Sequence, residues 1–99
     1  MSWRPLRRGS PVATTTEIGA TLLPEHRGHG VGTAAHRALV DYLWRHTTTH
    51  RLEAWTDRDN VAEQRVLERV GFAREGELRQ VEWRDGGWRD AVVYGLLRD

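Results

Sequence analysis

With 99 residues, 38% of them hydrophobic and 29% charged, the chain has room for one small globular domain and none for separate substrate and cofactor domains. The formal net charge is +1, all fifteen basic residues are arginine and cysteine is absent. These counts exclude disulfides, cysteine chemistry and a Schiff-base lysine, and they argue against nucleic-acid binding. No apolar run is long enough for a transmembrane segment or a signal peptide, so we expect a cytoplasmic protein with no membrane partner.

The first part of the sequence is expected to contain two strands and a glycine-rich turn. Residues 1–16, rich in arginine, proline and threonine, predict a loop with a short strand around Trp3. Residues 17–23 alternate in polarity and are followed by proline, which predicts a strand. The three alternate glycines of residues 27–32 then predict a turn that leads into a helix. The expected apolar face of that helix consists of Ala34, Ala35, Ala38, Leu39, Tyr42 and Leu43.

The middle of the sequence is expected to contain a strand and a second helix. The threonines at 47–49 end the first helix, and residues 51–56 alternate in polarity like a strand. Asn60 has the residue type and position of an N-cap, and Glu63, three residues later, completes a pair similar to a capping box. Gly71 is expected to end this helix in a left-handed conformation.

The C-terminal part is expected to form a hairpin. Residues 78–84 and 88–97 predict two strands, and the Asp-Gly-Gly sequence at 85–87 between them is a strong turn signal. Strand, helix, strand, helix and hairpin indicate an α/β (α+β) domain with a mixed central sheet.

The glycine-rich turn is the main candidate for binding chemistry. Glycines allow backbone N–H groups to approach an anion closely, and the helix that follows adds its positive N-terminal end. Arg27 and His29 would strengthen the preference for an anion. The spacing matches neither the dinucleotide fingerprint nor a lysine-containing phosphate loop, so the turn alone leaves the ligand open.

Few other residues are candidates for catalysis or metal binding. The only serines, Ser2 and Ser10, lie in the N-terminal loop, so a transferase of this sequence would use direct attack of the acceptor on the donor. His46 and His50 have the spacing of two metal ligands on a helix, but no carboxylate follows closely. We expect two solvated histidines at a helix end and no metal. We expect the tryptophan side chains to lie in the core and at an interface, in particular those of Trp55, Trp83 and Trp88.

Two segments resemble motifs of the Gcn5-related N-acetyltransferase (GNAT) superfamily, in particular its ribosomal-protein-acetylating RimJ/RimL-type branch. The first, LLPEHRGHGVGT at residues 22–33, is similar to the family's acetyl-CoA motif of Arg or Gln, two residues, Gly, one residue, then Gly or Ala. The second is NVAEQRVLERVGF at residues 60–72. The similarity runs from about Glu17 to the C-terminus, and two motifs in the correct order are more specific than either alone.

The resemblance implies an acetyl-CoA site and a role for several residues. The backbone from Arg27 to Thr33 would hold the pyrophosphate, and Asn60 would reach the pantetheine. The chain at Leu22 would pair with the pantetheine arm, and its backbone N–H would polarise the thioester carbonyl. Glu17, acting through a water, would accept the proton of the acceptor amine. The implied residues that bind acetyl-CoA are Leu22, Leu23, Arg27, Gly28, His29, Gly30, Val31, Gly32, Thr33 and Asn60.

The sequence also departs from the family pattern. Family members are considerably longer, and their first strand, two helices and second strand have no counterpart here. The resemblance therefore implies one N-terminally incomplete domain, with residues 1–16 preceding an acetyl-CoA-binding core at 17–99. Its incomplete sheet would leave an exposed edge, which favours a homodimer. Where this branch often has serine, a candidate proton donor for the leaving thiolate, this chain has Glu63, which is charged at neutral pH unless its pKa is raised.

Three functions are compatible with these observations. The first is an acetyl-CoA-dependent N-acetyltransferase that acts on a primary amine, either a protein N-terminus or a small amine, by direct attack in a ternary complex. The second is a catalytically inactive half-domain that binds CoA or a partner protein. The third, a small nucleic-acid-binding module, rests on the arginine content alone and would require steeply salt-dependent binding, so we expect no nucleic-acid partner.

Overall fold

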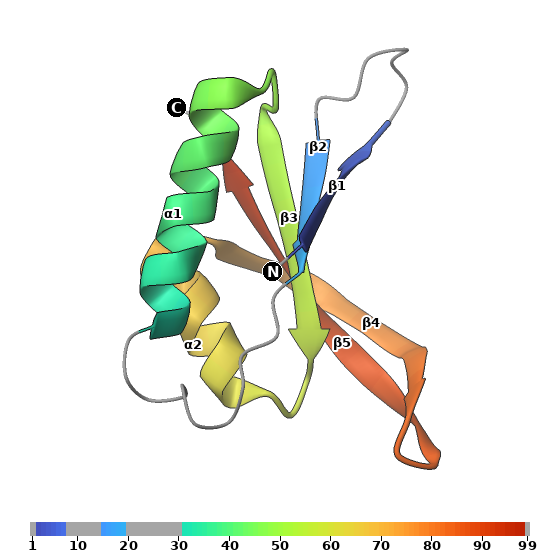
Figure 1. Ribbon diagram of the computed structural model, residues 1–99. Helices are drawn as coiled ribbons and strands as arrows, with labels where there is room; N and C mark the ends of the chain where they lie inside the picture. Colours follow the sequence, from blue (N-terminus) through green and yellow to red (C-terminus); the bar gives the residue numbers. More distant parts are fainter. Residues whose placement is uncertain (1, 8–14, 20–30, 99) are drawn as a thin grey trace.

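A computed structural model describes residues 2–7, 15–19 and 31–98. Both helices pack on one face of a single mixed sheet (Figure 1), which confirms the predicted α/β class and the C-terminal hairpin. The elements in chain order are β1 (Ser2–Leu6), β2 (Thr15–Gly19), α1 (Val31–His46), β3 (Arg51–Asp57), α2 (Val61–Val70), β4 (Ala73–Arg84) and β5 (Gly87–Leu97).

The sheet has the strand order β1-β2-β3-β5-β4, and among the described strands only the central pair β2–β3 is parallel. The parallel pairing runs from Thr15 opposite Arg51 to Ile18 opposite Ala54. Beyond that point β3 continues to Asp57 and pairs with β5 alone among the described strands. The pairing of β2 with β3 in the described part of the chain therefore covers the first four residues of β3.

The hydrophobic core lies between the sheet and the two helices. It consists of Ile18, Leu39, Val40, Leu43, Leu52, Ala54, Leu67, Phe72, Val92 and Tyr94. The expected apolar face of the first helix is wrong in part, because Ala34, Ala38 and Tyr42 are exposed. The buried face of α1 instead includes the polar residues Thr33 and His36. The buried face of α1 thus contains a histidine that the predicted apolar face did not include.

The second helix has both predicted caps. The Asn60 side chain accepts a hydrogen bond from the Glu63 backbone N–H at 3.2 Å, and Gly71 has a left-handed φ of 115°. Gly71 also donates its backbone N–H to carbonyls of the last turn. These contacts satisfy backbone groups that a helix otherwise leaves without partners at its ends.

The C-terminal hairpin is longer than predicted on its first strand. β4 begins at Ala73 and not at residue 78, while the turn at Asp85 and Gly86 has φ values of 52° and 77°, as a tight two-residue hairpin turn requires. β4 lies at the edge of the sheet and pairs only with β5. Its side chains are exposed on both faces, so it lacks the alternation by which strands are recognised in sequence.

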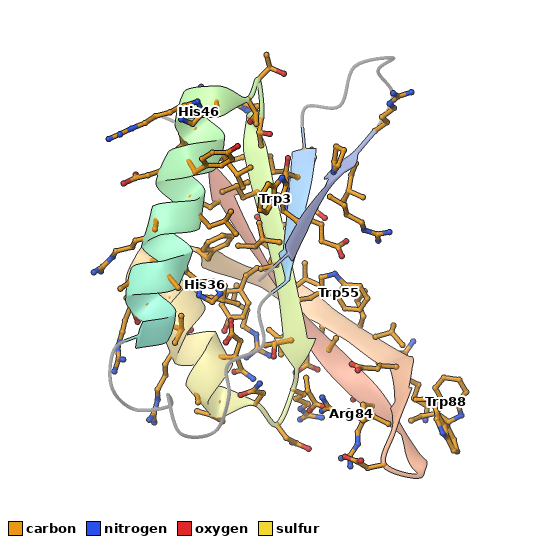
Figure 2. All side chains as sticks on the ribbon, in the orientation of Figure 1. Trp3, His36, His46, Trp55, Arg84 and Trp88 are labelled. Atoms are coloured by element: carbon orange, nitrogen blue, oxygen red, sulfur yellow. The ribbon has the colours of Figure 1, made fainter. Side chains whose placement is uncertain are left out.

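The tryptophans differ from expectation. Trp55, Trp83 and Trp88 are 41%, 62% and 59% exposed, so they do not belong to the core. Trp83 and Trp88 contact each other edge to face, with ring centroids 5.4 Å apart. Trp88 lies near the hairpin tip (Figure 2). Trp44 packs partly buried against the core. Neither α1 nor α2 is long and apolar enough to cross a membrane.

Candidate active site

Four of the residues predicted to bind acetyl-CoA lie at the N-terminal ends of the two helices, and Val31 is the first residue of α1. Gly32 and Thr33 are in the first turn of α1, and Asn60 caps α2. The helix begins at Val31, so Gly32 belongs to the helix and not to the turn before it. The remaining predicted positions, Leu22, Leu23, Arg27, Gly28, His29 and Gly30, lie outside the described residues and stay predictions.

A buried histidine connects these two helix ends. His36, whose side chain is 1% exposed, projects from α1 toward α2 (Figure 2). Its Nδ1 lies 2.6 Å from the carbonyl oxygen of Gly32, and its Nε2 lies 3.0 Å from Oε1 of Glu63 in the first turn of α2. The Glu63 backbone N–H in turn donates to Asn60. A continuous series of hydrogen-bonding groups therefore joins Gly32 to Asn60.

The surroundings of His36 favour its charged form. Both ring nitrogens face acceptors, and only the doubly protonated imidazolium donates to both. Burial lowers the pKa of His36, but the hydrogen bond to Glu63, the bond to the Gly32 carbonyl and the negative charge of Glu63 together outweigh burial and raise this pKa above 6.5. The negative charge of Glu63 is therefore balanced by a cation from the neighbouring helix.

The first turn of α1 also holds an unsatisfied donor. Thr33 is 9% exposed, and its hydroxyl has no hydrogen-bond partner in the described part of the chain. Buried hydroxyls are almost always hydrogen-bonded, so a bare one beside a helix N-terminus is a suitable donor for a ligand anion. The residues present therefore fit a phosphate-bearing ligand such as acetyl-CoA.

The loop from β3 to Asn60 is shaped by Asp57, a residue that the sequence analysis did not single out. The Asp57 carboxylate, with a side chain 3% exposed, accepts the backbone N–H of Asp59 at 2.7 Å and an Arg84 guanidinium N–H. The Asp57 carbonyl accepts the backbone N–H of Asn60 at 3.0 Å. A turn signal was available in the Asp-Arg-Asp-Asn sequence, because aspartate commonly bonds to the backbone two residues later.

The predicted base, Glu17, lies on the sheet face opposite the helices. Its neighbour Ile18 points into the core, and side chains alternate along a strand. Glu17 pairs with Arg4 of β1 at 3.3 Å and lies in register with Glu53 of β3. The structure thus does not bring Glu17 into the His36–Glu63 contact, and its role as a base stays a prediction.

Comparison with known proteins identifies the family. A model of the acetyltransferase (GNAT) domain matches residues 2–73, well over half of the chain. The chain belongs to the GNAT family. It is 42% identical over 62 residues, or 63% of its length, to a probable N-acetyltransferase, YjcK, of Bacillus subtilis, of which it covers 34%.

Solved structures of GNAT proteins have the same fold. The ribosomal-protein-S5-alanine acetyltransferase from Vibrio fischeri is 25% identical, with a TM-score of 0.87 over 98% of this chain and 52% of its own. A putative acetyltransferase of Salmonella typhimurium, yncA, solved with its cofactor acetyl-CoA, is 26% identical, with the same TM-score over 98% of this chain and 56% of its own. The chain spans 34% and 50% of the first two curated relatives it matches.

Within this GNAT domain, the histidines at 46 and 50 lie apart from the helix ends that form the site. His46 contacts Tyr42 on the exposed side of α1, with ring centroids 4.8 Å apart, and His50 is exposed after the helix. Residues 2–7, 15–19 and 31–98 contain no group of three or more side chains arranged to hold a metal ion.

Proposed function

We propose that this chain is an acetyl-CoA-dependent N-acetyltransferase that transfers an acetyl group to a primary amine by direct attack. The observation that carries the proposal is the meeting of two helix N-terminal turns, one with Gly32 and Thr33 and the other with Asn60, joined through His36 and Glu63. Two positive helix ends and an unsatisfied hydroxyl form a site for a polyanionic ligand.

The C-terminal end of β3 is the second part of the proposal. Residues Trp55 to Asp57 extend beyond the described pairing with β2, and we propose that their backbone groups hydrogen-bond to an extended ligand. The pantetheine arm of acetyl-CoA contains amide groups of the kind that pair with a strand edge. In this proposal the arm lies at that edge, and the amide nitrogen of Asn60, whose oxygen is occupied by the cap, donates to it.

In the transfer step, the acceptor nitrogen forms a bond to the acetyl carbon, the carbon–sulfur bond breaks, and CoA leaves as a thiolate that takes up a proton from water. The backbone N–H at Leu22 polarises the carbonyl, and Glu17 accepts a proton from the amine through a water. Arg4, which pairs with Glu17, is 68% exposed, so a cationic amine can compete with it for the carboxylate. The acceptor is a protein N-terminus or a small amine, and a homodimer formed at the edge strand β1 is part of the proposal.

Isothermal titration calorimetry with acetyl-CoA tests the binding half of the proposal. Wild type should bind saturably, and Arg27→Ala and Gly30→Val should lose most of the affinity. Arg45→Ala is the matched control, since it removes one positive charge from the exposed last turn of α1. Equal weakening by Arg27→Ala and Arg45→Ala would show a general charge effect and contradict a site at the glycine turn.

Thiol release with a panel of amines tests the transfer half. Peptides with a free N-terminus and polyamines are mixed with acetyl-CoA, and free CoA is measured. Release that depends on the amine and falls in Glu17→Gln supports the enzyme. Binding without release for any acceptor would instead support the second candidate, an inactive domain that binds CoA. Light scattering on the same sample measures whether the chain is a dimer.

A further inference from the structure

The His36–Glu63 contact is one of two polar side-chain contacts between α1 and α2 among the described residues. His36 reaches the first turn of α2, where Asn60 is the cap, at 3.0 Å. The neighbouring Arg37 reaches the last turn instead and donates to the Arg69 carbonyl at 3.0 Å. Adjacent residues of one helix therefore hold opposite ends of the other, and only the His36 link lies at the proposed site.

The two links also differ in burial. His36 is almost completely enclosed, and the Glu63 side chain is 15% exposed, whereas the Arg37 contact is at the surface. A buried ion pair adds little net stability over an apolar pair of the same shape, because both charges lose their hydration. A function in fixing geometry is the best-attested reason for such a pair. Here the geometry that it fixes is the spacing between Gly32 and Asn60.

We propose that His36 is a positioning residue, which holds the first turns of α1 and α2 at the separation that acetyl-CoA requires by bonding to Gly32 and Glu63. This inference rests on the proposed function, because its ligand is acetyl-CoA. Neither His36 nor Glu63 needs to touch the ligand. The backbone N–H of Glu63 donates to the Asn60 side chain and keeps it oriented. The His36 ring, in turn, holds the Glu63 carboxylate in place.

The decisive variant replaces both side chains by apolar ones of similar volume, His36→Leu with Glu63→Val. The pair of substitutions removes one positive and one negative charge, so the net charge that attracts a polyanion is unchanged. No polar group of the pair remains unpaired, so the unfolding free energy should be equal to that of wild type or higher. Acetyl-CoA should nevertheless bind about tenfold more weakly, the loss typical of a charge-assisted hydrogen bond that no longer orders the site.

Calorimetry with acetyl-CoA and urea unfolding are measured on each variant. Arg37→Gln is the control, since it breaks the other polar contact between the helices, at the end of α2 opposite Asn60. The affinity of Arg37→Gln for acetyl-CoA should remain within about twofold of wild type at a salt concentration of about 0.15 M, which screens exposed charges. Glu63→Ala provides a second test if the double variant does not fold. Removing the negative charge of Glu63 would by itself strengthen the binding of an anion such as acetyl-CoA. Weaker binding by Glu63→Ala therefore identifies a positioning effect.

The outcomes separate the two proposals. Wild type that fails to bind acetyl-CoA overturns the proposed function and this inference with it. Wild type that binds, together with a folded double variant or Glu63→Ala of equal affinity, overturns the inference alone. The inference is supported if the double variant and Glu63→Ala bind acetyl-CoA more weakly than wild type. The double variant must also be as stable as wild type, and Arg37→Gln must bind with unchanged affinity.

Discussion

Replacing Glu63 by glutamine should destabilise the domain in a pH-dependent way. Glutamine keeps the volume and can still accept a hydrogen bond from His36, but it lacks the charge that faces the imidazolium. A hydrogen bond to a charged group contributes about 1.5–3 kcal/mol and a neutral one about 1 kcal/mol, so the difference is about 0.5–2 kcal/mol. Because 15% of the Glu63 side chain meets solvent, which screens the pair, we expect a value near about 1 kcal/mol.

The sign of the pH dependence follows from the raised pKa of His36. Stability from the charged pair is fully present below the unfolded value of about 6.5 and is lost as the pH rises through the higher folded pKa. Urea unfolding at about pH 5.5 should therefore show a loss for Glu63→Gln that is about 1 kcal/mol larger than the loss at about pH 9. Asp41→Asn, on the exposed side of α1, is the control. An equal loss at both pH values would refute the argument that His36 is charged in the folded state.

Three further outcomes are expected. Asp57→Ala should lower the unfolding free energy by about 2 kcal/mol in urea titrations, since it removes the buried acceptor of a backbone N–H and of Arg84; no loss would mean that solvent replaces both bonds. Gly95→Ala should raise the lowered pKa of Glu75 toward its ordinary value in an NMR titration, because the new Cβ would collide with both Glu75 Oε2 and the Arg51 guanidinium and disrupt their ion pair; an unshifted titration contradicts this. Acetyl-CoA at about one hundred times its Kd should stabilise the chain by about 2.7 kcal/mol in thermal unfolding, and an unchanged midpoint would exclude a site in the folded state.

The parts of the fold that were predicted from sequence depend on local signals. The cap at Asn60, the stop at Gly71 and the turn at Asp85 and Gly86 each follow from the conformation that one residue type permits. In β3, the buried Leu52 and Ala54 alternate with polar residues. These features need no knowledge of the rest of the chain. The predicted start of the second strand at residue 17 is wrong, because β2 begins at Thr15 and the polar residues Thr15 and Thr16 are both buried.

The parts that were missed depend on distant partners. His36 counts as polar in a hydrophobic pattern, and its burial is explained only by Glu63, which lies on another helix. The first residues of β4 have no polarity pattern, because an edge strand exposed on both faces is held by backbone pairing with β5. The exposure of Trp83 and Trp88 follows from the length of that hairpin, which local composition did not indicate.

The exposed hairpin sets how unfolding of this chain would be observed. β4 pairs with β5 alone, its register is interrupted between Arg74 and Gly76 and again between Leu78 and Glu82, and its side chains contribute nothing to the buried core. Segments with few buried contacts open at a lower free energy than the whole domain. Amide exchange along β4, and fluorescence from Trp83 and Trp88, would therefore report local opening of the hairpin and not global loss of the fold.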